Sequence, residues 1–537
     1  MKFVKHILIC LLTVLLFYIS WAPNSMAGFM FIGFTPILHL IFSYDSNTRK
    51  FSNLYLITLL FFTFLFVNFS LTSWVIHAHL FGGIFASVFN ASLMTFVCFL
   101  IYKIKCKLGY KHALMAFPIL WIAFEYLHLN WDLTWPWMSL GNVFSEFPNW
   151  IQWYEFTGIL GGSLWVLLVN ILLFFTFNQL IKNQKFINPI FFSLFFLTTP
   201  FIISKKTIVD TNYTQGKKVN IVVVQPNYEP HAEKFNKPQT TQLKEVEELI
   251  KPIWNSNPAI IVFPETFLVD WIWESRLETA TGVLKMKSWL ADHPNTQILT
   301  GASTGRVLNK SEYSKTTARR SRNGTMFEVF NSALLISENK PTQVFHKSKL
   351  VPGAEMTPFA QILKPVFEKF PIKLGGSIGN FGTNDTLKNF RSFMGEFTPI
   401  ICYESVFGEY LSSFNSLGME WICIITNDGW WGDTFGHQQH HSYARLRAIE
   451  NRKYIVRSAN TGISSVINPL GTVEQFLPYG ESGVIETTIT KSKTHTFYSK
   501  HGDYIGRLAS FLAIVYLLQL VLTYLKNDTL DLKSLKK

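Results

Sequence analysis

Three apolar runs in this sequence each end in a residue that could take part in catalysis. Cys402 follows the run Thr-Pro-Ile-Ile, Glu265 follows Ala-Ile-Ile-Val-Phe-Pro, and Lys347 follows Val-Phe-His. A short apolar, β-branched run is typical of a buried strand, which presents a polar residue where the strand ends. We therefore expect the three residues to stand at the edges of strands and to form one catalytic constellation.

The chemistry of this constellation would be nucleophilic catalysis by a cysteine. Such a nucleophile needs a base that takes its proton and a positive group that stabilises the developing oxyanion. Glu265 can be the base if a largely apolar site raises its pKa, and Lys347 supplies a positive charge that favours the thiolate and the tetrahedral intermediate. The backbone N–H of Tyr403 can be a second oxyanion donor. Taken alone, Cys402 would be read as a small core residue.

The other cysteines and the histidines suggest no metal site and no disulfide framework. His437, His440 and His441 lie close together without a partner pattern, so we read them as a polar loop that leads into a helix. We therefore expect neither a metal ion nor a cofactor. The chain has five cysteines and no Cys-x-x-Cys pair: Cys10, Cys98, Cys106, Cys402 and Cys423.

Apolar residues concentrate in two parts of the 537-residue chain, residues 1–204 and 506–525, whereas residues 205–505 have the composition of a globular domain. Runs of about 18–22 apolar residues are long enough to cross a bilayer. We expect a helical bundle over 1–204, a soluble domain over 205–505, a C-terminal span over 506–525 and a tail over 526–537. The eight predicted spans lie near residues 5–22, 26–43, 54–71, 80–102, 111–128, 161–178, 187–204 and 506–525.

Basic residues in the short loops predict the orientation of these spans. They cluster in alternate loops, and the loops between them, 72–79 and 129–160, contain no lysine or arginine. By the positive-inside rule the basic loops are cytoplasmic, which places residues 205–505 on the outer side in spite of Lys205 and Lys206. Membrane topology therefore explains the net charge of +13 better than nucleic-acid binding does. The basic loop residues include Arg49, Lys50, Lys103, Lys105, Lys107, Lys111, Lys182 and Lys185.

Residues 217–505 alternate between apolar strand patterns and helix patterns, which predicts an α/β sandwich. Residues 305–325 interrupt the pattern with lysines and arginines among Ser, Thr and Asn. We read them as a solvated insertion, with contact to anionic headgroups as the alternative. The predicted strands are 219–224, 259–263, 297–301, 332–336, 399–401, 421–426 and 454–458, and the predicted helices are 240–250, 281–291 and 441–452.

The three stretches around Glu265, Lys347 and Cys402 resemble the signatures of the nitrilase, or carbon–nitrogen hydrolase, superfamily, which implies an αββα sandwich. Together with the spans, the whole chain resembles the apolipoprotein N-acyltransferase family within it. Further stretches support this resemblance: Trp135-Pro-Trp137, Gln225-Pro-Asn227, Asn427-Asp-Gly-Trp430-Trp431-Gly432, Arg447-Ala-Ile-Glu450-Asn-Arg452 and Asn460-Thr-Gly462.

The resemblance implies a two-step acyl transfer. A phospholipid, usually phosphatidylethanolamine, would acylate Cys402, and the thioester would pass its chain to the α-amino group of a diacylglyceryl-cysteine at a lipoprotein N-terminus. Glu265 would be the general base and Lys347 the oxyanion partner, and Glu355 would support Lys347 or the substrate. Tyr403 and Glu404 complete the Cys-Tyr-Glu motif. The family also implies a monomeric multi-pass protein of the cell inner membrane, with its catalytic domain on the periplasmic side.

Aromatic residues near the motifs suggest a substrate-binding or lid function. Trp430 and Trp431 could form a mobile lid, although tryptophans at an interface are often only anchors. Phe235 stands where many family members carry a tryptophan, and the segment ending at Glu355 reads Pro-Gly-Ala-Glu where Pro-Phe-Gly-Glu is usual. These departures leave an aromatic contact possible at Phe235 and change the turn before Glu355.

Two other functions are compatible with parts of this pattern. The first is a membrane-anchored nitrilase-type amidohydrolase that uses water as acceptor, although a single anchoring helix would suffice for it. The second is a transporter or lipid-binding scaffold with an inactive domain. Transporters usually carry charged residues in their spans, whereas Glu125 is the only clear carboxylate in a predicted span here.

Overall fold

The computed structural model describes residues 2–44, 52–182, 187–360, 380–384 and 386–534. The chain forms two compact units. The bundle unit consists of Met1–Ser73, Phe81–Ile208 and Asp503–Lys537, and the sandwich unit consists of Trp74–Leu80 and Val209–Gly502.

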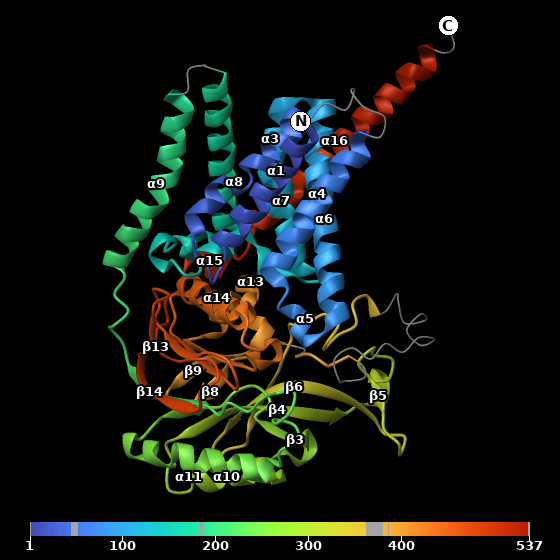
Figure 1. Cartoon of the computed structure of the whole chain (residues 1–537). Helices are drawn as coiled ribbons and strands as arrows, with labels where there is room; N and C mark the ends of the chain where they lie inside the picture. Colours follow the sequence, from blue (N-terminus) through green and yellow to red (C-terminus); the bar gives the residue numbers. More distant parts are fainter. Residues whose placement is uncertain (1, 45–51, 183–186, 361–379, 385, 535–537) are drawn as a thin grey trace. The chain divides into compact units, whose positions relative to one another are not determined.

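Long apolar helices make up the bundle unit (Figure 1). Among the described residues, seven helices are long and apolar enough to cross a membrane. Their outward side chains include many exposed leucines and phenylalanines, as expected for helices that face lipid. The seven helices are α1 (Lys2–Ser20), α4 (Ser52–Thr72), α6 (Leu80–Leu108), α7 (Tyr110–Asn130), α8 (Tyr154–Ile181), α9 (Ile187–Asp210) and α16 (Tyr504–Ser534).

The segment predicted as the second span, 26–43, is not one continuous helix. It consists of η1 (Ala27–Phe29), α2 (Met30–Gly33) and α3 (Thr35–Ser43). Asn170 of α8 stabilises the break: its Oδ1 accepts hydrogen bonds from the backbone N–H groups of Phe34 and Thr35, at 2.8 and 3.2 Å. Its Nδ2 donates to the carbonyl oxygen of Met30 at 2.8 Å. A buried side chain can break a helix in an apolar bundle when it satisfies the freed backbone groups in this way.

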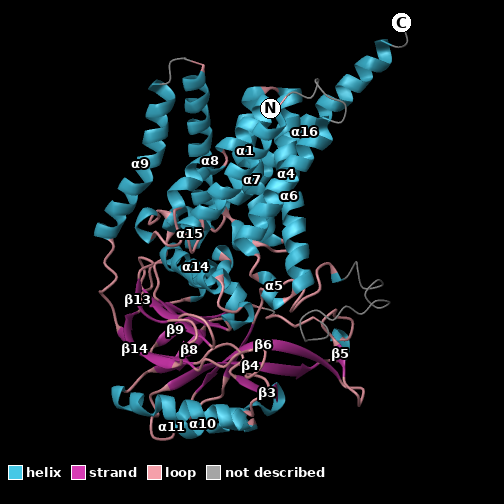
Figure 2. Cartoon of the chain, in the orientation of Figure 1, coloured by secondary structure: helices cyan, strands magenta, loops and turns pink. Residues whose placement is uncertain are grey.

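Two β-sheets form the centre of the sandwich unit (Figure 2). In the first, β1, β2 and β4 are parallel neighbours. In the second, β9, β10 and β11 are parallel neighbours. The first sheet follows the order β14 (Gly483–Thr490), β1 (Lys218–Gln225), β2 (Ile260–Val262), β4 (Gln297–Val307), β6 (Met326–Ile336), β5 (Arg319–Arg320), with β3 (Leu268–Trp273) beside β4 and β7 (Gln343–His346) beside β6. The second follows the order β13 (Val473–Leu477), β12 (Ser464–Ile467), β11 (Ile455–Ala459), β10 (Trp421–Thr426), β9 (Gly395–Ile401), β8 (Phe390–Ser392).

The alternation of side chains along β1 shows how the layers pack. Val219, Ile221 and Val223 belong to the core that also contains the strands of the second sheet. Val222 and Val224 point to the opposite face and pack with α10 (Gln239–Ile250) and α11 (Thr281–Leu290). Successive residues of a strand point to opposite faces, so an apolar run such as this is buried on both sides. Figure 1 shows α10 and α11 along the outer face of the first sheet.

Helices α13 (Gly408–Ser413) and α14 (Phe435–Asn451) pack on the second sheet and complete the layers. The predicted αββα sandwich is therefore confirmed. Helix α14 begins at Phe435, six residues before the predicted start, so His437 and His440 lie within a helix and not in a loop. Thr434 caps this earlier start, because its hydroxyl accepts a hydrogen bond from the N–H of Gly436.

The basic insertion is partly folded. β4 and β6 extend the first sheet into it and remain paired out to Val307 and Phe327, and β5 adds a short pairing. Arg306 forms ion pairs with Glu312 and Glu328, at 3.0 and 3.1 Å. The prediction of a solvated loop over the whole of 305–325 is therefore wrong at its start, where β4 continues and buried Glu328 neutralises the arginine.

Candidate active site

The residues predicted to form the catalytic constellation come from three strand ends of the sandwich unit. Glu265 follows β2, Lys347 follows β7 directly, and Cys402 follows β9 directly. All three side chains are buried, with Lys347 only 1% exposed. The parallel pairing of β2 with its neighbours and the antiparallel pairing of β7 with β6 bring these ends together. Packing of the two sheets adds Cys402 from the second sheet.

Lys347 connects two glutamates. Its Nζ donates to Oε1 of Glu355 at 2.8 Å and lies 3.4 Å from Oε1 of Glu265. Asn331 of β6 joins the same carboxylates, because its Nδ2 donates to Glu265 at 2.8 Å and to Glu355 at 3.2 Å. Glu355 in turn accepts a hydrogen bond from the backbone N–H of Val351 at 2.8 Å. The predicted support of Lys347 by Glu355 thus has a direct contact, and Asn331 is a residue that the sequence analysis missed.

The surroundings raise the pKa of both Lys347 and Cys402, so that the lysine is charged and the thiol is neutral. Burial lowers the pKa of Lys347, but the negative charges of Glu355 and Glu265 outweigh burial, so that the pKa lies above its usual value. The lysine therefore stays protonated. Burial, followed by the charge of Glu265, raises the pKa of the Cys402 thiol, and Lys347 only partly offsets the shift. The thiol is therefore protonated at neutral pH, and it needs a base.

The backbone of Cys402 has the left-handed conformation, with φ at +50°. Such a conformation costs free energy in a residue with a side chain and is held by its surroundings. Two groups bind its carbonyl oxygen: the hydroxyl of Ser405 donates at 2.7 Å, and Nε2 of His440 lies 3.2 Å away. The strand end, the sharp turn and these contacts direct the nucleophile out of the sheet.

A fully buried ionic group supports His440. Asp428 Oδ1 lies 2.8 Å from Nδ1 of His440, and Asp428 Oδ2 accepts a hydrogen bond from Nη2 of Arg457 at 2.6 Å. Burial opposes ionisation of Asp428, but the charges of Arg457 and His440 hold the pKa of this carboxyl well below its usual range. This network was not predicted from the sequence. Its only signals were the Asn427-Asp-Gly stretch and the cluster of histidines, which was read as a loop.

Glu404 lies at the centre of a second network and is completely buried. Its Oε1 accepts hydrogen bonds from the backbone N–H of Ser348 at 2.7 Å and from the hydroxyl of Tyr410 at 2.8 Å. Its Oε2 accepts one from the N–H of Ile401 at 2.8 Å. Burial raises the pKa of Glu404 to about 7 in spite of these bonds. The carboxylate thus ties the residue after Lys347 to the residue before Cys402.

The predicted aromatic residues fall into different environments. Phe235 and Trp430 are partly exposed, 49% and 36%, and their rings stack with centroids 5.9 Å apart. Trp431 instead packs against Trp74, with ring centroids 4.7 Å apart. Tyr403 is buried, and its ring meets Phe407 edge to face. The structure brings Phe235 to Trp430 and separates the environments of the two neighbouring tryptophans.

The segment Trp74–Leu80 is far from these residues in sequence but belongs to the sandwich unit. Nε1 of Trp74 donates to Oε1 of Gln439 at 3.2 Å, and a side chain at Gly436 would collide with the Trp74 ring. The segment therefore supports Trp431 and the first turn of α14. This contact was not expected from the sequence, which assigned 72–79 to a loop of the bundle.

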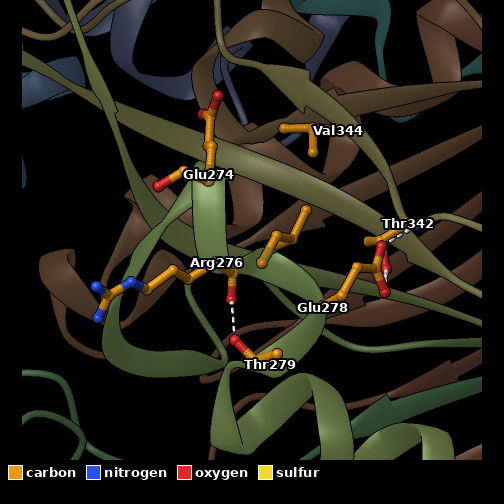
Figure 3. Close-up of a pocket in the computed structure, with 8 residues that line it drawn as sticks. Glu274, Arg276, Glu278, Thr279, Thr342 and Val344 are labelled. Carbon is orange, nitrogen blue, oxygen red and sulfur yellow. Dashed lines mark hydrogen bonds between the residues drawn. The ribbon is translucent and has the colours of Figure 1, made fainter.

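A surface hollow of the sandwich unit is separate from the buried cluster (Figure 3). Glu278 binds Thr342 across it, and the guanidinium of Arg276 points away. Glu274, on its rim, binds Nε2 of His346 at 2.7 Å and so holds the residue before Lys347. Because neither Glu265, Lys347 nor Cys402 lines the hollow, we do not place the chemistry there. Its lining residues are Glu274, Ser275, Arg276, Leu277, Glu278, Thr279, Thr342 and Val344.

The fold and the buried cluster agree with the similarity of this sequence to known families. The carbon-nitrogen hydrolase family model matches residues 221–497, more than half of the chain. The chain therefore belongs to the carbon-nitrogen hydrolase family. The apolipoprotein N-acyltransferase N-terminal domain model matches residues 14–172 of the same chain.

Two curated relatives match most of the chain, and both are apolipoprotein N-acyltransferases. The protein of Chlorobaculum tepidum is 28% identical over 456 residues, which cover 82% of this chain and 84% of that protein. The protein of Rickettsia typhi is 29% identical over 416 residues, which cover 76% and 77%. A solved CN-hydrolase superfamily protein of Xanthomonas campestris aligns with 51% of this chain and 91% of its own, at 15% identity and a TM-score of 0.35.

Proposed function

We propose that this protein is a phospholipid-dependent apolipoprotein N-acyltransferase, with Cys402 as nucleophile, Glu265 as general base and Lys347 as oxyanion partner. The observation that carries the proposal is that one chain combines the buried Glu265–Lys347–Cys402 cluster with a bundle matching the apolipoprotein N-acyltransferase N-terminal domain. Membrane-length helices agree with two lipid substrates, since a soluble amide substrate would need no such bundle.

In the first half-reaction, Glu265 takes the proton of the Cys402 thiol, whose raised pKa makes a base necessary. The thiolate attacks an ester carbonyl of the phospholipid, and the oxyanion that forms is stabilised by charged Lys347, with the N–H of Tyr403 as the second donor. The ester C–O bond then breaks. The leaving alkoxide takes the proton from Glu265, which releases the lysophospholipid and leaves a thioester on Cys402.

In the second half-reaction, the α-amino group of a diacylglyceryl-cysteine attacks the thioester carbonyl. Glu265 accepts a proton from the nitrogen, and Lys347 again stabilises the oxyanion. The C–S bond breaks, the proton passes from Glu265 to the sulfur, and the product is an N-acylated lipoprotein. The contact of Lys347 with Glu355 at 2.8 Å supports this assignment, because it keeps the ammonium charged and oriented throughout both steps.

The proposal includes location, boundaries and partners. Alternating basic loops favour a cell inner membrane protein with a periplasmic catalytic domain over 205–505, a bundle over 1–204, a final span over 506–525 and a cytoplasmic tail. Phosphatidylethanolamine is the proposed donor, and the enzyme is proposed to act as a monomer. Phe235, Trp430 and Trp431 are proposed to contact lipid, and the exposure of the first two supports this.

The competing function is an amidohydrolase in which water discharges the acyl-enzyme. It uses the same cluster, so the geometry of Cys402 and Glu265 fits both functions. The match of residues 14–172 favours the acyltransferase.

The decisive experiment is intact mass spectrometry of the purified full-length protein after incubation with phosphatidylethanolamine. We expect a mass gain of one acyl chain that is absent in Cys402→Ala and is discharged by a diacylglyceryl peptide with a free amine. Cys423→Ala is the matched control, because Cys423 is buried within β10, and it should be acylated normally. An adduct that persists in Cys402→Ala would exclude this nucleophile, and discharge by water alone would favour the hydrolase.

A further inference from the structure

Lys234 is a buried lysine beside the cluster that the proposed mechanism does not use. Its side chain is 1% exposed. Within the described part of the chain, its ammonium has no carboxylate at ion-pair distance, although Lys237, three residues on, pairs with Glu233 and Glu245. Burying a charge without a partner is costly, so such a group is retained where it serves a purpose.

The ammonium of Lys234 binds the turn that carries the proposed base. Nζ donates to the backbone carbonyl oxygen of Glu265 at 2.7 Å and to the hydroxyl of Thr266 at 3.0 Å. Thr266 has φ at +47°, a strained conformation for a β-branched residue. The turn also rests on Gly301 of β4, where a Cβ would lie 2.3 Å from the backbone nitrogen of Thr266. Lys234 on one side and Gly301 on the other thus hold the turn in place.

The position of Lys234 is itself well determined. Its carbonyl oxygen accepts a hydrogen bond from Nε2 of Gln242, a buried residue of α10, at 2.6 Å. The next residue, Phe235, stacks on Trp430. The backbone of Lys234 is therefore anchored by a helix of the outer layer, and Lys234 is the sequence neighbour of Phe235 in the exposed aromatic pair.

We propose that Lys234 is a positioning residue for the general base: it fixes the Glu265–Thr266 turn and places a positive charge beside the base and the nucleophile. The inference deepens the proposed function and rests on the role of Glu265 in it. Removal of this charge would make the anionic forms of the base and nucleophile less favourable, so the acid limb of the rate–pH profile should shift to higher pH. The other groups that act on Glu265 and Cys402 stay unchanged in this experiment: Lys347, Asn331, Glu355 and Asp428.

The test measures the rate of Cys402 modification against pH in the full-length protein. Two reactions are followed by mass spectrometry: acylation by phosphatidylethanolamine and alkylation by iodoacetamide, with the Cys402 peptide quantified separately. The variants are Lys234→Met and Lys234→Gln, which lose the charge, and Lys234→Arg, which keeps it. Lys237→Met is the control, because it removes a nearby lysine that is already paired with Glu233 and Glu245.

We expect Lys234→Met to lower acylation at pH 7 about 100-fold and both neutral variants to move the acid limb up by about one pH unit. Lys234→Arg should retain at least about a tenth of the rate with an unmoved acid limb, and Lys237→Met should behave like the wild type. Equal losses in all three Lys234 variants, or an acid limb that never moves, would overturn the proposal. If Lys234→Met fails to fold, Lys234→Gln decides by the same criterion.

The alkylation arm separates this inference from the proposed function. If the wild type is not acylated by the phospholipid, the acyltransferase proposal fails. The same shift in the acid limb of alkylation would still support the role of Lys234, because alkylation requires only the thiolate of Cys402 and its base. Alkylation profiles that coincide in wild type and Lys234→Met would reject that role.

Discussion

The carboxylate of Glu404 accepts a hydrogen bond from the backbone N–H of Ser348 at 2.7 Å. This contact joins two loops, since Ser348 follows Lys347 and Glu404 lies two residues after Cys402. The second carboxylate oxygen of Glu404 accepts a hydrogen bond from the backbone N–H of Ile401. The distance between the lysine and the nucleophile is therefore maintained by a residue that touches neither side chain.

Replacing Glu404 with glutamine should impair both stability and activity. The amide can accept at only one position, so its NH₂ group would face a backbone N–H of Ile401 or Ser348 and leave it unpaired. We expect a stability loss of about 1–3 kcal/mol and a roughly tenfold to hundredfold slower acylation of Cys402. Thermal unfolding and single-turnover acylation measure the two effects.

The control for Glu404→Gln is Glu396→Gln near the start of β9, the strand that precedes the Cys402 turn. Among the residues that the structure describes, Glu396 forms an ion pair only with Arg391, which is 84% exposed, and such surface pairs contribute little to stability. The pH dependence adds a second check. Because the pKa of Glu404 is raised to about 7 in the folded state, the folded chain holds this proton more tightly than the unfolded chain does. The contribution of the protonated group to stability is therefore complete below the unfolded-state pKa and is lost as the pH rises through 7. The stability deficit of Glu404→Gln should therefore shrink between pH 4.5 and 7, and a constant deficit would contradict this.

His440→Gln should slow acylation of Cys402 by about 10- to 100-fold. The variant disturbs the contact with the Cys402 carbonyl oxygen and leaves Asp428 with fewer partners, so the strained turn of the nucleophile loosens. Because Nε2 lies by the backbone and not by the thiol, the shape of the pH profile should not change. If His440→Gln removed or added an ionisation in the pH dependence of the acylation rate, a proton-transfer role would instead be assigned to His440. His441→Gln is the control: His441 binds Ser465, and we expect less than a threefold change.

The stability of the protein should also reveal the cost of burying Lys234. Burial lowers the pKa of Lys234 to about 7. Between this value and the ordinary value of 10.5, the unfolded chain binds more protons than the folded one, so the contribution of this group to stability rises with pH. The unfolding free energy of the wild type relative to Lys234→Met should therefore increase from pH 7 to 10.5, by at most about 1.4 kcal/mol per pH unit. Denaturant titrations at several pH values test this, and a difference that falls with pH would contradict it.

Phe235 should be replaceable by tryptophan but not by alanine. Its ring stacks on Trp430, and an indole can keep this contact, whereas alanine removes it. We expect Phe235→Trp to acylate within about threefold of the wild type and Phe235→Ala to be about tenfold slower. Phe476→Ala is a control, since Phe476 is a more exposed phenylalanine of β13 in the same unit. Equal losses for alanine and tryptophan at position 235 would argue against an aromatic contact.

Much of the architecture could be predicted because it depends on local pattern. The runs ending in Glu265 and Cys402 are apolar and β-branched, so each must be a buried strand wherever it lies in the fold. The long apolar runs predict membrane-length helices for the same reason. The pattern failed at 26–43, where composition alone cannot reveal that Asn170, more than a hundred residues away, satisfies a broken backbone.

By itself, the sequence determined which residues stand at the strand ends, the order Glu265, Lys347, Cys402, and the division between apolar bundle and sandwich. Only the tertiary structure decided which other groups reach them: Asn331, Glu404, Lys234 and the Asp428–His440 pair. Their roles depend on hydrogen bonds between residues that lie 12 to 66 positions apart in the sequence. A hydrophobic pattern specifies burial and period, but the direction in which a buried polar side chain finds its partner depends on how the strands and sheets pack.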